Sequence, residues 1–323
     1  MLDRTSLDYL SKDLSIAMMP GSESAVQGNT EILSVVGPNQ VYVDGTRLLA
    51  SGSFPSDVER LALTEQVIVA ALETGRIDEA QALLAPLRTR FETIPKDTVQ
   101  FGSLRVARLE GMLLEAQGKH EAALDIYNRA LVQDEAYAPI LKRKVGLLLD
   151  QGKTTDAMKE LSHYLDHFSS DLEAWTMLAT LYLQANMFQQ AAFCYEECMM
   201  LSTHNYLFTT RYAELMMTMG KPKLALKYFS LAVEITASAG GALRAWYGLR
   251  QASKALIEEF NASSAGKGAG KKGKTDVEED DSVSIDDWKE LNRVAGERIL
   301  GIYSEKKAGS ETVSVVKSWL QTV

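Results

Sequence analysis

Two pairs of side chains that bind metals in other proteins stand at helical spacing in this sequence. Cys194 and Cys198 lie four residues apart, and His163 and His167 flank Asp166 at the same spacing. Residues four apart share one face of a helix, so each pair offers two ligands to a metal ion. Two ligands fill only half of a tetrahedral site, and the sequence predicts no second cluster to complete either one. We therefore predict that the cysteines pack in a core and that the histidines lie on a solvated helix face.

The short motifs of nucleotide binding and hydrolysis are missing from the sequence. It contains no G-x-S-x-G, no G-x4-G-K-[ST] and no dinucleotide fingerprint after a strand. The string GKGAGKKGK imitates a phosphate loop, but no strand precedes it and no helix opens after it, which favours a flexible linker. We expect no catalytic residue, no cofactor and no metal, and hence a protein that is not an enzyme.

Composition limits the class of protein further. With 46% hydrophobic and 24% charged residues among 323, the chain can fold, and its net charge of −9 argues against nucleic-acid binding. The N-terminus has no apolar signal region, and no stretch approaches 18 consecutive apolar residues. We expect a cytosolic or nuclear chain with no membrane span of its own.

A period of 34 residues runs through the middle of the chain. Glycine or asparagine ends a helix, an alanine five residues later allows close helix contact, and a large residue then fills the gap. This order, with W-x2-L-A-x2-Y starting at Trp175, is typical of the tetratricopeptide repeat and predicts an all-α solenoid. The repeating columns are Gly118, Gly152, Asn186 and Gly220; Ala123, Ala157, Ala191 and Ala225; Tyr127, Leu161, Tyr195 and Phe229; and Ala130, Tyr164, Cys198 and Ala232.

The repeat also fixes the expected domain organisation. An earlier repeat opens at Ser56 and turns at Gly75, and a degraded sixth repeat begins near Gly241. We therefore expect turns near residues 75, 118, 152, 186 and 220, and no β-strand. The predicted parts are a partly irregular N-terminal extension over 1–55, with a short helix around Leu7–Ala17; a solenoid of about five and a half repeats over 56–260; a flexible linker over 261–282; and C-terminal helices over 283–323.

The predicted C-terminal helix carries one apolar stripe. Trp288, Leu291, Ala295, Ile299 and Ile302 recur at helical spacing. An isolated helix cannot keep such a stripe in water, so it docks either on the last repeat or on another protein. We favour a cap on the solenoid, and we keep Trp288, Leu291 and Ile299 as candidate partner-binding residues.

A basic cluster marks a second candidate surface. Arg105, Arg108, Lys142, Arg143 and Lys144 fall on the first helices of two neighbouring repeats. In a tetratricopeptide array these helices line the concave groove, and the positions of Arg105, Arg108 and Lys142 face inward. A basic groove wall in an acidic protein favours an acidic partner segment, and an ordinary solvated helix face is the alternative. We expect these charges to be exposed.

Longer strings carry a resemblance to a known family. LTEQVIVAALETGRIDEAQALL, RLEGMLLEAQGK, EAWTMLATLYL and AAFCYEECMM followed by HNYLF together resemble subunit 2 of the endoplasmic-reticulum membrane protein complex. AAFCYEECMM followed by HNYLF is not part of the generic repeat consensus. The resemblance covers about residues 57–254.

The resemblance implies a non-catalytic scaffold on the cytosolic face of the endoplasmic reticulum. In that family the solenoid holds cytosolic parts of the membrane-embedded subunits and of a β-sandwich subunit. The assembly inserts transmembrane segments, including tail anchors, into the membrane. The alternative is a free-standing cytosolic adaptor that binds acidic peptide segments in its concave groove.

Overall fold

The protein is built from antiparallel helix pairs. The computed structural model describes residues 37–52, 54, 56–91, 101–236, 242–266, 284–305 and 309–322, and within these ranges it contains helices and turns but no strand. The expected short helix around 7–17 and most of the 261–282 linker lie outside the described residues, as do residues 92–100. The chain divides into two compact units, Met1–Phe168 and Ser169–Val323.

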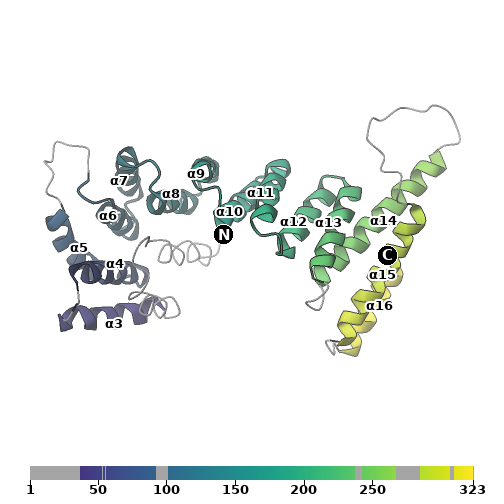
Figure 1. Cartoon of the computed structure of the whole chain (residues 1–323), viewed down its shortest axis with the longest axis horizontal. Helices are drawn as coiled ribbons and strands as arrows, with labels where there is room; N and C mark the ends of the chain where they lie inside the picture. The colour runs from purple at the N-terminus through teal and green to yellow at the C-terminus, as the bar shows by residue number, and fades with distance from the viewer. Residues whose placement is uncertain are drawn as a thin grey trace. The chain divides into compact units, whose positions relative to one another are not determined.

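The first unit stacks seven described helices in chain order (Figure 1). Helix α3 packs on α4, and α4 with α5, α6 with α7, and α8 with α9 form the pairs. The bounds are α3 Pro38–Ser51, α4 Asp57–Glu73, α5 Ile77–Phe91, α6 Leu104–Ala116, α7 His120–Gln133, α8 Ala138–Asp150 and α9 Thr154–His167.

The second unit contains two further pairs and a three-helix end. Helices α10 with α11 and α12 with α13 form the pairs, α14 packs on α13, α15 packs on α14, and α16 contacts α15. The bounds are α10 Leu172–Gln184, α11 Phe188–Leu201, α12 Tyr206–Thr218, α13 Pro222–Ile235, α14 Leu243–Gly266, α15 Ile285–Glu305 and α16 Ser310–Thr322.

The predicted turns are confirmed. In each pair the first helix ends at a left-handed residue, and at Gly118 the backbone φ is 74°. The Gly118 N–H donates to Glu115 O and the Lys119 N–H to Leu114 O, which is the hydrogen-bond pattern that closes a helix C-terminus. Asn186 takes the same conformation at φ 58° with equivalent bonds, because asparagine tolerates the left-handed region better than most residues.

The alanine column lies at the helix contacts, as predicted. Ala123, Ala157, Ala191 and Ala225 are all fully buried. The first helices contribute small residues of their own: a Cβ at Gly111 would lie 2.1 Å from the Tyr127 ring, and one at Gly248 would lie 2.1 Å from the Phe229 ring. Small residues on one helix therefore receive the large residue of a neighbouring helix.

Two boundaries differ from the sequence prediction. Residues 38–51, expected as irregular chain, form helix α3, which starts with Pro38 and ends at left-handed Gly52. Gly45 is buried against Val67 of α4, so the glycine that lowers helix propensity permits the close packing that stabilises this helix. The expected linker also begins later, because α14 continues as one helix through Gly266.

Candidate protein-interaction site

The predicted basic cluster is held by acidic partners from neighbouring helices. Glu65 of α4 accepts hydrogen bonds from two arginines of α6: Arg105 Nε at 2.9 Å and Arg108 Nη2 at 2.5 Å. The Glu65 and Arg108 side chains are only 9% and 6% exposed, whereas Arg105 is 47% exposed. The sequence prediction that Arg108 is exposed is therefore wrong, because Glu65 neutralises its charge inside the helix stack.

A second, partly buried network joins helices α6, α7 and α8. Glu115 of α6 accepts a hydrogen bond of 2.5 Å from the Tyr127 hydroxyl of α7 and forms an ion pair with Arg143 of α8. Burial raises the pKa of Tyr127 well above its ordinary value, so the phenol remains a proton donor. Arg143 thus links two repeats.

The remaining basic residues also contact the stack. Lys144 Nζ lies 2.7 Å from Glu160 of α9, and Lys142 Nζ lies 5.5 Å from the centre of the Tyr164 ring. Arg105 and Lys142 are the more accessible of the three residues placed on inward positions. Their role in binding a partner stays a prediction. The positive charge of the basic cluster is largely neutralised by acidic residues of the helix stack.

The sequence prediction included the basic residues of the cluster but missed the acidic residues that pair with them. Glu65 and Glu115 stand on the first helices of their pairs, as the arginines do, and Glu160 stands on a second helix. In a tetratricopeptide array the second, fifth, ninth and twelfth residues of a first helix face the groove. Glu65 is the ninth residue of α4 and Glu115 the twelfth of α6, so the same positions would have found these acids as partners.

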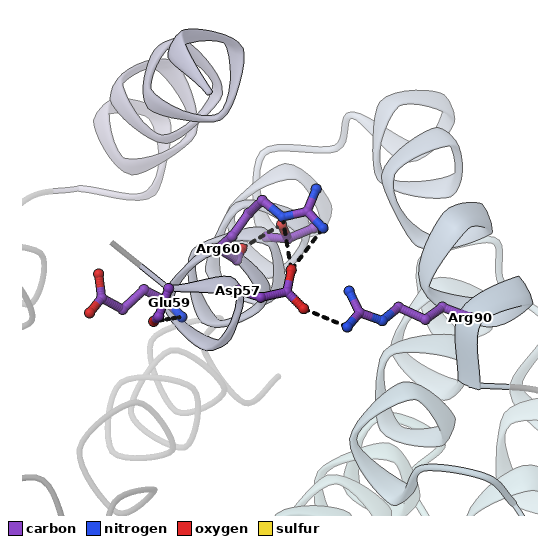
Figure 2. A network of polar contacts seen from close by, with 6 residues as sticks. Asp57, Glu59, Arg60 and Arg90 are labelled. Carbon is purple, nitrogen blue, oxygen red and sulfur yellow. Dashed lines mark hydrogen bonds and ion pairs between the residues drawn. The ribbon is translucent and has the colours of Figure 1, made fainter. Parts of the chain in front are cut away.

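An exposed network ties α4 to α5 (Figure 2). Asp57, at the start of α4, accepts hydrogen bonds from Arg90 at 2.5 Å and from Arg60 at 2.9 Å. These two hydrogen bonds, that of Arg90 first, lower the pKa of Asp57 to about 2. Ser56 caps the same helix by accepting a 3.2 Å hydrogen bond from the Glu59 N–H, as its sequence position predicts.

The C-terminal stripe packs as a cap on the last repeat helix, where α14 and α15 run side by side (Figure 1). Ala295, Ile299 and Ile302 are buried, while Trp288 and Leu291 are half-buried. Of the three candidate partner-binding residues on this stripe, only Trp288 and Leu291 therefore retain accessible surface in this unit.

Polar contacts fix the cap in register. Arg250 of α14 donates from Nη2 to Leu320 O of α16 at 2.6 Å. Asn292 of α15 donates from Nδ2 to Arg250 O at 3.1 Å and to Ser253 Oγ at 3.1 Å. A Cβ at Gly296 would lie 2.4 Å from Arg250 Nη1, so the glycine leaves room for the arginine to pass α15 in this position.

The cysteines are core residues, as predicted. Cys194 and Cys198 are buried, and Cys198 Sγ lies 3.7 Å from Thr176 Oγ1. Burial raises the pKa of the Cys194 thiol to about 12, so this thiol is unreactive at neutral pH.

Helix α11 also presents apolar side chains to solvent. Phe193 and Met200 lie seven residues apart, and Leu201 follows Met200 directly. Their exposed fractions are 54% for Phe193, 75% for Met200 and 42% for Leu201. The Phe193 ring meets the Trp175 ring edge-on, with centroids 5.9 Å apart. Among the described helices, none is both long and apolar enough to cross a bilayer.

The repeat domain is similar to domains of known proteins. The family model described as the EMC2 TPR-like repeat domain matches residues 99–226. The resemblance to subunit 2 of the ER membrane protein complex is confirmed. The ER membrane protein complex subunit 2-B of Xenopus laevis is 37% identical over 202 residues, which cover 62% of this chain and 64% of that one.

Two further proteins extend this comparison. The TPR repeat protein oca3 of Schizosaccharomyces pombe is 32% identical over 199 residues, covering 60% of this chain and 66% of that one. The chain thus spans slightly less than two thirds of the curated relatives' length. The crystal structure of the C-terminal part of a TPR repeat-containing protein from Cytophaga hutchinsonii shares the fold, with a TM-score of 0.51 at 13% identity over 86% of this chain and 97% of that one.

Proposed function

We propose that this chain is a non-catalytic scaffold subunit of an ER membrane protein complex and binds its cytosolic side. The observation that carries the proposal is the family match over residues 99–226, together with the 202-residue similarity to a protein named as subunit 2 of that complex. The matched region holds helices α6 to α12 and only the first turn of α13, which is most of the repeat array.

The physical character of the repeats supports a scaffold. Stacked helix pairs bury one face against their neighbours and present the other as an extended binding surface. The polar residues of the basic cluster pair with acidic residues of neighbouring helices and so stabilise the stack. The exposed apolar side chains of α11 also suit a protein that works in an assembly, because apolar patches on a folded surface mark protein contacts.

In this role the chain organises the cytosolic parts of membrane-embedded subunits and of a β-sandwich subunit. The assembly inserts transmembrane segments, including tail anchors, into the ER membrane, and the chain contributes binding surface to that process. We expect partners to contact two residues of the basic cluster, Arg105 and Lys142, and two residues of the C-terminal cap, Trp288 and Leu291.

Cell fractionation tests this function. A scaffold of a membrane complex sediments with microsomes and is released by detergent as a large assembly. A free-standing adaptor that binds acidic peptides remains in the cytosolic supernatant, and that result would overturn the proposal.

Matched substitutions test the contact residues. Arg105→Gln is paired with Arg129→Gln, because both arginines are 47% exposed and both have a carboxylate partner. We expect Arg105→Gln, but not Arg129→Gln, to lower the amount of co-purified partner subunits. Equal recovery of partners with both variants would remove Arg105 from the interface.

A further inference from the structure

Three potential metal ligands converge in the first compact unit, outside the surfaces described above. His163 and His167 lie one turn apart on α9, with ring centroids 5.0 Å apart and ring planes at 73°. Glu135, in the turn between α7 and α8, places its Oε1 atom 3.6 Å from His163 Nε2. One ligand atom from each of the three side chains lies within 4.8 Å of the other two.

The histidine pair is visible in the sequence, but the third ligand is not. Glu135 is 28 residues from His163 and belongs to a turn, so only the packing of α8 against α9 brings the two together. The solvated helix face was predicted because no third ligand was visible in the sequence. Glu135 supplies that ligand.

The backbone on both sides of the cluster is well fixed. Asp134 Oδ1 accepts a 3.2 Å hydrogen bond from the Ala136 N–H, which shapes the turn that carries Glu135. On the other side, α9 ends with the Phe168 N–H donating to Tyr164 O at 2.9 Å, and the Phe168 ring stacks on the Tyr164 ring. Only side-chain rotation is therefore needed to close the cluster around an ion.

We propose that Glu135, His163 and His167 form a site for a divalent transition-metal ion of the Zn²⁺ class. Two imidazole nitrogens and one carboxylate oxygen are a set of protein ligands that Zn²⁺ takes in known sites, with water in the fourth position. Bonds of about 2.0–2.2 Å separate tetrahedral ligands by roughly 3.3 Å, so the three atoms have to approach one another by about 1.5 Å at most. All three side chains are at least partly exposed, which leaves room for that adjustment.

The ligand chemistry also predicts the selectivity of the site. Imidazole favours Zn²⁺, Cu²⁺ and Ni²⁺, whereas Mg²⁺ and Ca²⁺ prefer sites built from oxygen. A bound ion would join the α7–α8 turn to α9, and its water position would be open to a ligand from another molecule. A simple ion pair between His163 and Glu135 would show no such preference among metals.

Calorimetric titration of the untagged 323-residue chain with ZnCl₂ alone tests the site. We expect one Zn²⁺ per chain, no measurable binding of Mg²⁺ at the same concentrations, and affinity lowered about tenfold or more by His163→Gln, His167→Gln or Glu135→Gln. His204→Gln is the matched control, because His204 is also exposed and belongs to the other compact unit. Thermal melts without metal confirm that each variant folds.

Three results would overturn the proposal. One is the absence of saturable Zn²⁺ binding to the wild-type protein below about 1 mM, a Kd that corresponds to only about 4 kcal/mol. Another is unchanged affinity in His163→Gln and His167→Gln, which would place the ion elsewhere, for example at the cysteine pair. The third is an equal loss of affinity in His204→Gln, which would indicate non-specific binding to surface histidines.

Discussion

Adding one methyl group at Gly111 tests the packing of the repeats most sharply. An ideal Cβ at this position would lie 2.1 Å from Tyr127 Cε1, 2.4 Å from Cζ and 2.7 Å from the hydroxyl oxygen. Carbon atoms in contact normally stand about 3.5–4.0 Å apart, so Gly111→Ala creates an overlap of roughly 1.4–1.9 Å. The ring cannot easily yield, because Tyr127 is fully buried and its hydroxyl is bonded to Glu115.

The magnitude follows from two destabilising effects and one stabilising effect. Overpacking costs about 1–3 kcal/mol, and loss of the hydrogen bond to the Glu115 carboxylate costs about 1.5–3 kcal/mol if the ring moves. Alanine regains about 1 kcal/mol of helix propensity over glycine. We therefore expect Gly111→Ala to lower the free energy of unfolding by about 2 kcal/mol.

Two glycines of the second compact unit serve as a matched pair that tests the direction of the stability change. A Cβ at Gly248 would lie 2.1 Å from the Phe229 ring, whereas one at Gly301, inside α15, would meet no atom within 4 Å. Gly248→Ala should destabilise the protein, and Gly301→Ala should stabilise it by up to about 1 kcal/mol. Urea unfolding followed by circular dichroism measures all three variants. A Gly111→Ala protein as stable as the wild type would refute the assigned helix contact.

Three further outcomes are expected. Ala191→Leu should cost about 1–3 kcal/mol in a thermal melt, because Ala191 is fully buried where helices meet, and an unchanged melt would show that the repeat register is wrong. Arg108→Ala should cost about 1–3 kcal/mol in urea unfolding because it removes a charged partner from buried Glu65; a loss below about 0.5 kcal/mol would contradict that pairing. Asp57 has a lowered pKa of about 2 in the folded state. The stability that its arginine contacts provide is therefore complete above its unfolded pKa and is lost as the pH falls through 2. An NMR titration in which Asp57 titrates at its ordinary value of 3.8 would contradict the network.

The sequence is informative wherever the repeat imposes one residue type. A left-handed turn requires glycine or asparagine, and a close helix contact requires alanine, so the turns at Gly118 and Asn186 and the buried position of Ala191 were predictable. The C-terminal stripe likewise predicted a docked helix, since its apolar residues have to leave water.

Charge pairs across the stack were less predictable. Glu65 and Arg105 are 40 residues apart, and only the packed helices show that the acid neutralises two arginines. Helix α3 was missed for a similar reason, because Gly45 lowers helix propensity and its packing against Val67 becomes visible only in three dimensions. Glu135 stands in a turn, where no helical periodicity relates it to His163.

Affinity purification of the chain from detergent-solubilised ER membranes, at its native expression level, tests the central claim most directly. If the chain is a scaffold subunit of an ER membrane protein complex, it elutes within one large particle, and mass spectrometry finds membrane-embedded subunits in fixed ratio to it. Elution as a single 35.6 kDa chain, with no membrane protein in fixed ratio, would contradict the account.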